Sequence, residues 1–437
     1  MSEVVATAQQ GLAGKYPPYP EYKDSGVVWL GDVPEHWVLS RVKDVAVVFG
    51  GYPFDSQRFS PDVGVPLIRI RDINTELTAV YFDGDVPQEA IVENNDVLIG
   101  MDGEFNVARW KGGKAALNQR VACVRTDSDE LTTLLFYTLP FSLKVVNDLT
   151  YYTTVKHLSL EDIKKTIFAL PQGEELSNIV AFLDYETARI DRLIAQQQWL
   201  IELLKEKRQA VISHAVRTRA SEGHIKLAYA INLLTGYPFA SSGFKSTKDT
   251  HIPLLRGANV GVDQIKWDDV VYWDSEDCSH LDDYYLERGD IVFGMDRPWI
   301  SSGARVAEIT QHDTPCLLLQ RVARIRAKAN HFQSYIKLCL SSNEFRNYVE
   351  ADLTGVSVPH ISPDQIKGFL IRNLPYDEQV SVTNEVLQVL EKLNAVERAA
   401  FNAIELLQER RTALISAAVT GKIDLRGWTP PSDEEAA

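Results

Sequence analysis

Apolar residues recur at alternating intervals of three and four over two long stretches of the chain, about residues 174–219 and 378–420. Sustained spacing of this kind is typical of helices with a coiled-coil seam. Each stretch closely follows a proline, Pro171 or Pro375, has acidic residues in its first turn, and contains no proline itself. The pattern therefore predicts two long α-helices. The expected seams are Ile190, Leu193, Gln197, Leu200, Leu204 and Val211 in the first helix, and Leu393, Val396, Ala400, Ala403, Leu407 and Leu414 in the second.

Each predicted helix would be on the order of 60 Å long, because an α-helix rises about 1.5 Å per residue. A helix of that length cannot leave its apolar seam in water. We therefore expect the two helices to pack together as an antiparallel coiled coil, with pairing to another chain as the alternative. Such a pair would act as a spacer that holds the rest of the chain at a fixed separation.

The remaining sequence, residues 38–173 and 221–377, has a different pattern. Short β-rich runs, such as residues 66–70 and 290–293, alternate with turns rich in Gly, Asp and Asn. This mixture predicts α+β globules.

The two globules and the two helices are copies of each other. Several motifs occur twice in the same order: 49–54 with 234–239, 96–102 with 290–296, 119–122 with 320–323, 157–159 with 360–362, and 201–204 with 404–407. A repeat of this size differs from the short periods of solenoids. It predicts two similar folded units with pseudo-two-fold symmetry, suited to a ligand with two related halves.

These patterns together predict an α+β protein in which two globular domains in tandem duplication are each followed by a long helix. The expected segments are an N-terminal segment (1–37), a first domain (38–173), a central helix (174–220), a second domain (221–377), a C-terminal helix (378–422) and a tail (423–437).

Composition narrows the possible functions. The chain has 437 residues, with no apolar run near the roughly 18–20 residues that span a bilayer and no signal-peptide pattern at its start. Its four scattered cysteines favour reduced thiols and a cytoplasmic location. No Gly-rich nucleotide loop, metal-ligand spacing or nucleophile arrangement stands out. We therefore predict a protein without catalytic residues, cofactor or metal of its own.

Charge is unevenly distributed along the chain. The net charge of −15 argues against a simple nucleic-acid binder. Residues 105–126, however, contain five basic side chains and no acid, and the corresponding part of the second copy is also rich in arginine. Matched basic runs in both copies favour a binding role over two merely solvated strands.

The two ends of the chain carry the most specific motifs. They are Tyr22-Lys-Asp-Ser-Gly-Val-Val-Trp-Leu-Gly-Asp-Val-Pro-Glu-His-Trp37 and Ala413-Leu-Ile-Ser-Ala-Ala-Val-Thr-Gly-Lys-Ile-Asp-Leu-Arg-Gly-Trp428. With the repeated 96–102 and 290–296 motifs and the Leu-Pro-x-x-Glu starts of the helices, they make nearly the whole chain resemble the specificity subunits of Type I restriction–modification systems.

The resemblance implies two target-recognition domains, each of which reads half of a split sequence in double-stranded DNA. It also implies helices that set the distance between the half-sites and dock two methyltransferase subunits, with motor–endonuclease subunits joining for cleavage. S-adenosylmethionine, ATP and Mg²⁺ would then be bound by the partner subunits, and no cofactor by this chain.

Candidate DNA contacts are polar, cationic or aromatic residues in the loops between the predicted strands, because side chains read base edges while phosphate contacts set the register. In the first copy they are Tyr52, Arg69, Arg71, Asn106, Arg109, Lys111 and Lys114, and in the second Tyr237, Lys245, Arg256, Asn259, Arg297, Trp299 and Arg305. The Tyr-Pro-Phe motif occurs in both copies, which favours a framework or DNA-backbone role for its tyrosine.

The copies differ where discrimination would be expected. Residues 104–109 have no sequence similarity to residues 298–303 at the comparable place. Different surfaces on a shared scaffold predict an asymmetric bipartite target.

Two other functions remain open from the residues alone. One is a single-chain DNA methyltransferase or nuclease with duplicated DNA-binding domains, which would bind S-adenosylmethionine by itself. The other is a coiled-coil protein adaptor without DNA readout, which the acidic charge favours. Salt-sensitive, sequence-selective DNA binding separates these from a specificity subunit.

Overall fold

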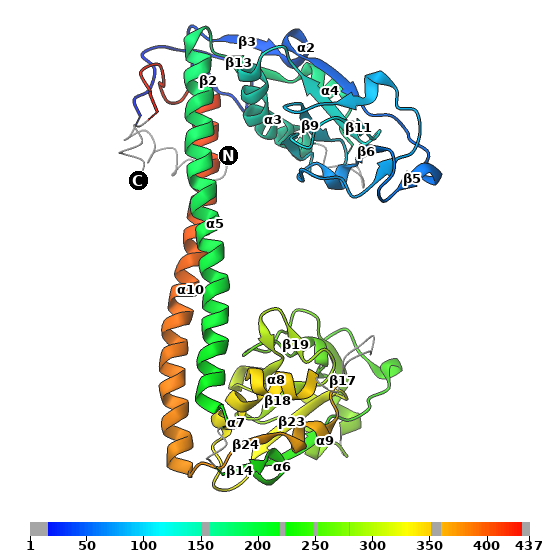
Figure 1. Ribbon diagram of the computed structural model, residues 1–437, viewed down its shortest axis with the longest axis vertical. Helices are drawn as coiled ribbons and strands as arrows, with labels where there is room; N and C mark the ends of the chain where they lie inside the picture. Colours follow the sequence, from blue (N-terminus) through cyan, green and yellow to red (C-terminus); the bar gives the residue numbers. More distant parts are fainter. Residues whose placement is uncertain are drawn as a thin grey trace. The chain divides into compact units, whose positions relative to one another are not determined.

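The computed structural model describes residues 16–149, 157–218, 223–248, 251–278, 280–350 and 360–430 (Figure 1). The chain divides into two compact units. The first unit comprises residues up to 196 together with those from 403 onward, and the second comprises residues 197–402. Both divisions fall inside the long helices α5 (Glu174–Val216) and α10 (Tyr376–Val419). Each unit mixes strands with helices, as the sequence predicts.

The first unit is built on a four-stranded antiparallel sheet in the order β10-β9-β12-β4. Its central strand β9 (Val97–Gly100) is buried along its whole length, and α3 (Asp129–Leu149) packs against it. The other strands are β4 (Val47–Gly50), β10 (Val107–Arg109) and β12 (Val121–Arg125). A second sheet has the order β5-β7-β6-β11-β8, from β5 (Phe59–Ser60), β6 (Val65–Ile68), β7 (Tyr81–Phe82), β8 (Ile91–Val92) and β11 (Ala115–Leu117).

The second unit repeats this arrangement. Its four-stranded sheet has the order β15-β23-β18-β21, in which each strand takes the place of β4, β12, β9 and β10 in turn. The strands are β15 (Ile231–Thr235), β18 (Ile291–Gly294), β21 (Val306–Glu308) and β23 (Val322–Ala327). A smaller sheet of β16 (His251–Leu255), β17 (Val271–Asp274) and β22 (Leu317–Leu318) has the parallel β16–β22 pairing that β6 and β11 show in the first unit.

A two-stranded ladder precedes each long helix. It pairs β3 (Val38–Arg41) with β13 (Ile167–Leu170) in the first unit, and β14 (His224–Lys226) with β24 (Leu370–Arg372) in the second. Just before β13 and β24 lie the short helices α4 (Leu160–Lys165) and α9 (Pro363–Gly368). Ser159 and Ser362 cap these helices through their hydroxyls, which explains why the His-x-Ser motif occurs twice.

The long helices contact each other within each unit. In the first unit Arg411 Nε of α10 lies 2.8 Å from Asp191 Oδ1 of α5. In the second unit Arg208 of α5 donates to the side-chain oxygen of Asn394 and lies 3.9 Å from Glu397 Oε2 of α10. Ile201 of α5 and Ala400 of α10 are both buried.

The predicted seam is wrong at two positions. Leu193 and Val396 are 37% and 44% exposed, whereas their neighbours Ile194 and Glu397 are half-buried. Leu193 and Ile194 are similarly apolar, so hydrophobicity alone could not choose between them. Glu397 can lie further inward than Val396 because Arg208 lies beside its carboxylate. At adjacent positions of a heptad, the partner helix decides which side chain is covered.

The helices also end slightly before the predicted 220 and 422. A carbonyl at the end of α5, that of Ala215, accepts a hydrogen bond of 3.2 Å from Arg372 Nη1. The end of α10 is closed by Gly421, whose φ is 67°, with the Gly421 amide donating to Ala418 and the Lys422 amide to Ala417. This pair of bonds is a Schellman motif, which favours glycine at that place.

The two family-like end segments meet in the first unit. The indole of the buried Trp37 donates to Glu175 Oε1 at 3.0 Å, at the start of α5. The amide of Asp424 donates to the carbonyl of Pro17 at 2.7 Å. The apolar residues of 413–419 and Trp37 belong to one buried cluster. Residues 1–15 of the predicted N-terminal segment and 431–437 of the predicted tail lie outside the described residues.

Neither a membrane span nor a metal site is found in the described part of the chain. No helix there is long and apolar enough to cross a lipid bilayer. No group of three or more His, Cys, Asp or Glu side chains among those residues is placed to hold a metal ion.

Candidate nucleic-acid interface

A Gly-Tyr-Pro-Phe segment directly follows β4 in the first unit and β15 in the second. The Tyr52 amide donates to the Leu117 carbonyl at 2.8 Å, and the Tyr237 amide donates to the Leu318 carbonyl at 3.0 Å. A Cβ on Gly51 would lie 2.2 Å from the Leu117 carbonyl oxygen, so no larger residue fits there. The repeated motif thus has a framework role, as its occurrence in both copies predicts.

The two tyrosine side chains differ in their surroundings. Tyr52 is 46% exposed. Tyr237 packs against Phe239 and Tyr284, with ring centroids 5.0 and 5.2 Å away. Tyr52 makes the equivalent contact with Phe54, at 5.3 Å, but it is the more exposed of the two.

Arg69 and Arg256 occupy equivalent tight turns. The Arg69 amide and Nε both donate to Asp72 Oδ2, at 3.1 and 3.0 Å. The Arg256 amide donates to Asn259 Oδ1 at 3.1 Å, and its Nη2 to the Asp269 carbonyl at 2.7 Å. Both guanidinium groups therefore already have a hydrogen-bond partner, Asp72 for Arg69 and Asp269 for Arg256.

Asn259 is the clearest departure from expectation among the candidate residues. Its side chain is 2% exposed, and its amide donates to the carbonyls of Lys266 and Asp269 at 2.8 and 2.9 Å. A buried amide with its donors satisfied is a structural element of the turn. Its position does not support the expectation of a DNA contact.

Four candidate residues of the first copy lie on the turn between β9 and β10, on β10 itself, or shortly after it. Asn106 is exposed on this turn, next to Phe105, whose φ is 50° and whose ring is buried. Lys114 is exposed, and Lys111 Nζ lies 3.7 Å from Glu76 Oε1. Arg109 is half-buried on β10 and lines a groove with residues of α3, α5 and α10.

In the second copy the equivalent turn is more heavily packed. Arg305 donates from Nε to the Val260 carbonyl and from Nη1 to the Asp296 carbonyl, both at 3.0 Å, and burial lowers its pKa. The Trp299 ring packs against Phe345, 5.6 Å between centroids. Arg297 is exposed with a φ of 44°. Lys245 is also exposed, and its backbone pairs with Tyr272.

The structure thus sorts the candidate residues into two groups. Those with exposed side chains are Tyr52, Arg71, Asn106, Lys111, Lys114, Lys245 and Arg297. Those that are buried, half-buried or tied to neighbours are Arg69, Arg109, Tyr237, Arg256, Asn259, Trp299 and Arg305. The basic runs therefore predicted exposed cations only in part, since several of their arginines are held by neighbouring residues.

A buried carboxylate anchors the same place in each four-stranded sheet. Asp96, 5% exposed, accepts from Arg125 Nε at 2.8 Å and from the Glu93 amide at 2.8 Å. Asp290 accepts in the same way from Arg326 and from the Glu287 amide. The hydrogen bonds to Asp96 and Asp290 raise the pKa of Arg125 and Arg326.

A second matched group is exposed and was not singled out as a DNA contact from the sequence. Asp102 accepts from Arg120 and from His157 Nδ1, the latter at 2.8 Å. Asp296 accepts from Arg321 Nη1 at 3.1 Å and from His360 Nδ1 at 2.6 Å. Partial burial raises the pKa of Asp102, but the hydrogen bonds from His157 and Arg120 outweigh it and hold the pKa below its ordinary value. The repeated Gln-Arg and His-x-Ser motifs were the signal that could have found this group.

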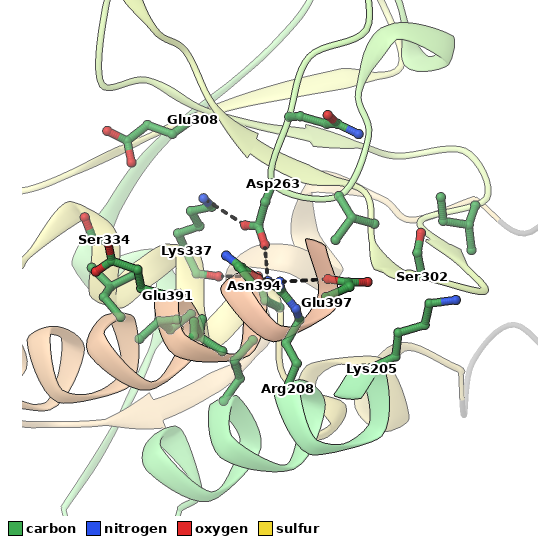
Figure 2. A pocket seen from close by; sticks show the side chains of 18 of the residues that line it. Lys205, Arg208, Asp263, Ser302, Glu308, Ser334, Lys337, Glu391, Asn394 and Glu397 are labelled. Carbon is green, nitrogen blue, oxygen red and sulfur yellow. Dashed lines mark hydrogen bonds and ion pairs between the residues drawn. The ribbon is translucent and has the colours of Figure 1, made fainter. Parts of the chain in front are cut away.

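In the second unit a polar cluster ties a loop to both long helices. Figure 2 shows Arg208 of α5 directed toward Asp263, Asn394 and Glu397. Asp263 Oδ2 lies 3.3 Å from Arg208 Nη1, and its Oδ1 lies 2.9 Å from Lys337 Nζ. The same carboxylate thus holds the loop around residue 263 to α5 and to α7 (Gln333–Leu340).

Comparison with known proteins finds a family with a similar sequence. Residues 34–203 match the family model of the Type I restriction modification DNA specificity domain. Over this domain the chain is similar to Type I specificity subunits. The predicted resemblance to that family, whose role is DNA recognition, is therefore confirmed.

Related specificity subunits extend the match beyond one domain. The specificity subunit of the Type I restriction enzyme EcoBI from Escherichia coli is 25% identical over 431 residues, covering 92% of this chain and 90% of that protein. The EcoAI specificity subunit, also from Escherichia coli, is 36% identical over 179 residues, which are 40% of this chain and 30% of that protein. The MjaVIII specificity subunit of Methanocaldococcus jannaschii is 23% identical over 418 residues, covering 90% and 94%.

A solved structure shares the fold of this chain. It comes from work on complex assembly and conformational transition of the type I R-M system, and has a TM-score of 0.67 at 15% identity. The alignment covers 89% of this chain and 98% of that one.

Proposed function

We propose that this chain is the non-catalytic subunit that gives a Type I restriction–modification complex its DNA sequence specificity. Residues 38–173 and 221–377 would each form a target-recognition domain that reads one half-site of a bipartite target. The supporting observation is that one sheet topology occurs twice while the exposed side chains around it differ. A shared scaffold with different reading surfaces fits an asymmetric target.

The exposed candidate residues define the proposed reading surfaces. In the first domain Asn106 and Arg71 are exposed, and both are side chains that pair with base edges or phosphates. In the second domain Arg297 and Lys245 take that role. The tied residues, such as Arg69 and Arg305, would hold the reading loops in shape.

The long helices would form an antiparallel coiled coil with pseudo-two-fold symmetry that fixes the half-site spacing. The contacts of Asp191 with Arg411 in one unit and of Arg208 with Asn394 in the other follow one antiparallel register. We infer that the chain acts in the cytoplasm, on chromosomal and incoming DNA.

The same helices would dock two methyltransferase subunits. Large apolar side chains are exposed at equivalent positions of the two helices, Leu193 with Val396 and Leu203 with Leu406. Exposed apolar side chains mark a protein interface where they form a contiguous patch, and matched pairs suit two identical partners. Those partners would supply S-adenosylmethionine and adenine methylation, and motor–endonuclease subunits would supply ATP- and Mg²⁺-dependent cleavage.

Genome-wide mapping of methylated adenine tests this function. We expect one asymmetric, bipartite methylated sequence in cells that carry the chain with its methyltransferase partner, and its loss when the gene for this chain is deleted. Unchanged methylation after deletion would overturn the proposal. S-adenosylmethionine binding by the isolated chain would favour a single-chain enzyme. A purified complex without salt-sensitive, sequence-selective DNA binding would favour the adaptor.

A further inference from the structure

An Asp–Arg–His group occurs twice with nearly the same geometry. In the first unit Asp102 is paired with Arg120 and His157, and in the second Asp296 is paired with Arg321 and His360. The backbones correspond as well, because the amide after each histidine donates to the methionine before each aspartate, at 2.7 and 2.9 Å. We call each group a triad.

The arginine and the histidine of each triad face solvent. The side chains of Arg120 and Arg321 are 60% and 61% exposed, and those of His157 and His360 are 60% and 43% exposed. The carboxylates are more covered, at 17% and 29%. The aspartate therefore acts as an anchor that orients an exposed guanidinium and imidazole.

Fold stability alone does not explain these exposed groups. Exposed ion pairs contribute a median of roughly 0–1 kcal/mol. The neighbouring pairs of Asp96 with Arg125 and of Asp290 with Arg326 already link β9 to β12 and β18 to β23, with carboxylates that are 5% and 4% exposed. Beyond these buried anchors the triads add a link to His157 and His360, through side chains that are largely exposed.

Each triad adjoins the loop that differs between the copies. Asp102 precedes residues 104–109, and Asp296 precedes residues 298–303. A constant charged group thus lies beside a variable loop in each unit. The two half-sites of an asymmetric target differ in bases, but they share the phosphodiester backbone, which carries no sequence information directly.

We propose that each triad binds a backbone phosphate of the DNA, at equivalent places in the two half-sites. The Asp-oriented guanidinium of Arg120 or Arg321 keeps N–H groups available for a phosphate oxygen, a geometry for which arginine is well suited. This inference rests on the proposed function. It adds that the triads set position and affinity, while the adjacent loops read bases.

Salt-dependent DNA binding by the complex with its methyltransferase partner tests the inference. The variants are Arg120→Gln, Arg321→Gln and the double variant, measured on the target duplex and on a scrambled duplex of equal length. A plot of log K against log salt has a negative slope. We expect each single variant to reduce the magnitude of that slope by about 0.9, and the double variant to reduce it by about twice as much. Affinity should fall by a similar factor on both duplexes, with the methylated sequence unchanged.

Matched controls separate phosphate binding from a general charge effect. Arg426→Gln removes another exposed, ion-paired arginine, which lies 2.5 Å from Asp424 Oδ2 and outside both proposed recognition domains, and should leave the slope unchanged. Arg120→Lys keeps the charge and should keep the slope while losing part of the affinity. A wild-type complex tested on duplexes with single neutral methylphosphonates should lose affinity at one equivalent phosphate per half-site, and Arg120→Gln should abolish that loss in the first half-site.

The outcomes distinguish this inference from the proposed function. Unchanged slopes in well-folded Arg120→Gln and Arg321→Gln complexes overturn it, as does a change in the methylated sequence, which would make the triad a base reader. If a variant does not fold, the methylphosphonate scan of the wild-type complex decides. The inference is overturned if that scan finds no pair of sensitive phosphates at equivalent places in the two half-sites. Failure of the wild-type complex to select its target would instead refute the proposed function.

Discussion

At the scale of single residues, charged side chains of the same type serve two different purposes. Asp96 is buried and accepts three hydrogen bonds from Arg125 and the Glu93 amide. Asp102, six positions later, is paired with side chains that face solvent. Burial thus separates an aspartate that serves the fold from one that can serve a ligand.

We predict that Asp96→Asn destabilises the first unit by about 1–3 kcal/mol, because the buried side chain loses its charge-assisted hydrogen bonds with Arg125, whose own side chain is 40% exposed. The urea unfolding midpoint of the purified complex measures the change. Glu161→Gln is the control, since Glu161 is 64% exposed and pairs with Lys164 on the surface of α4. A midpoint equal to that of the control would contradict a structural role for Asp96.

Asn106 provides a residue-scale test of base reading. It is exposed on the turn that differs between the copies, and asparagine can pair with both polar groups of an adenine edge. We predict that Asn106→Ala relaxes one base position of the first half-site, with a loss of about 1–3 kcal/mol in discrimination. Methylation mapping measures this, and the second half-site is the internal control. Relaxation in both half-sites would contradict separate reading.

At the scale of elements, the sequence predicted the positions of the long helices better than it predicted which helix faces and which strands contact each other. The heptad period located α5 and α10 because it depends on neighbours in the same helix. It misplaced Leu193 and Val396, since the choice between adjacent positions depends on the partner helix. The parallel pairing of β6 with β11 joins strands far apart in the chain, so no local pattern reports it.

The candidate site was predictable to a similar degree. Repeats and basic runs led to loops that carry exposed polar and cationic side chains, but they did not predict which side chains are exposed and which are held by neighbours. Arg305 and Asn259 are satisfied by carbonyls of residues that only folding brings near. The triads were visible as repeated motifs, yet their shared geometry arises from tertiary contacts between distant segments.

The C-terminal end of α10 offers an element-scale prediction. Gly421 has a φ of 67°, and a Cβ there would lie 2.3 Å from Pro34 Cδ. We predict that Gly421→Ala destabilises the first unit by about 1–3 kcal/mol, from the left-handed backbone and from displacement of the N-terminal segment. Thermal unfolding of the complex measures it. Gly427→Ala, where a Cβ meets nothing within 4 Å, is the matched control, and equal effects of both would contradict the reason given.

At the scale of the whole molecule, the proposed domains should be exchangeable. Val38 and Leu170 are register partners in the β3–β13 ladder, so a graft of residues 38–173 carries this ladder intact. We predict that replacing 38–173 with the same domain of another specificity subunit changes one half-site of the methylated sequence and leaves the other unchanged. Methylation mapping in cells measures this. A simultaneous change in both half-sites would contradict modular reading.

The coiled-coil spacer makes a further prediction about the distance between half-sites. If the register of the Asp191–Arg411 and Arg208–Asn394 contacts continues along both helices, residues 197–203 of α5 face about residues 399–405 of α10. Deleting both segments shortens each helix by about 10.5 Å and removes nearly two full turns, so the helix faces stay in phase. At about 3.4 Å per base pair, this corresponds to roughly three base pairs of spacer.

We therefore predict that the doubly shortened protein no longer methylates the native target, and that any target it does methylate has a shorter spacer with unchanged half-sites. DNA also rotates as the spacer shortens, so affinity should fall even on the best target. Deleting only one segment should prevent assembly, because the helices then lose their register. A same-length variant, in which the exposed residues of both segments are replaced by other helix-forming residues, should keep the native spacing. Methylation of the native spacing by the doubly shortened protein would show that the helices do not determine the distance between half-sites.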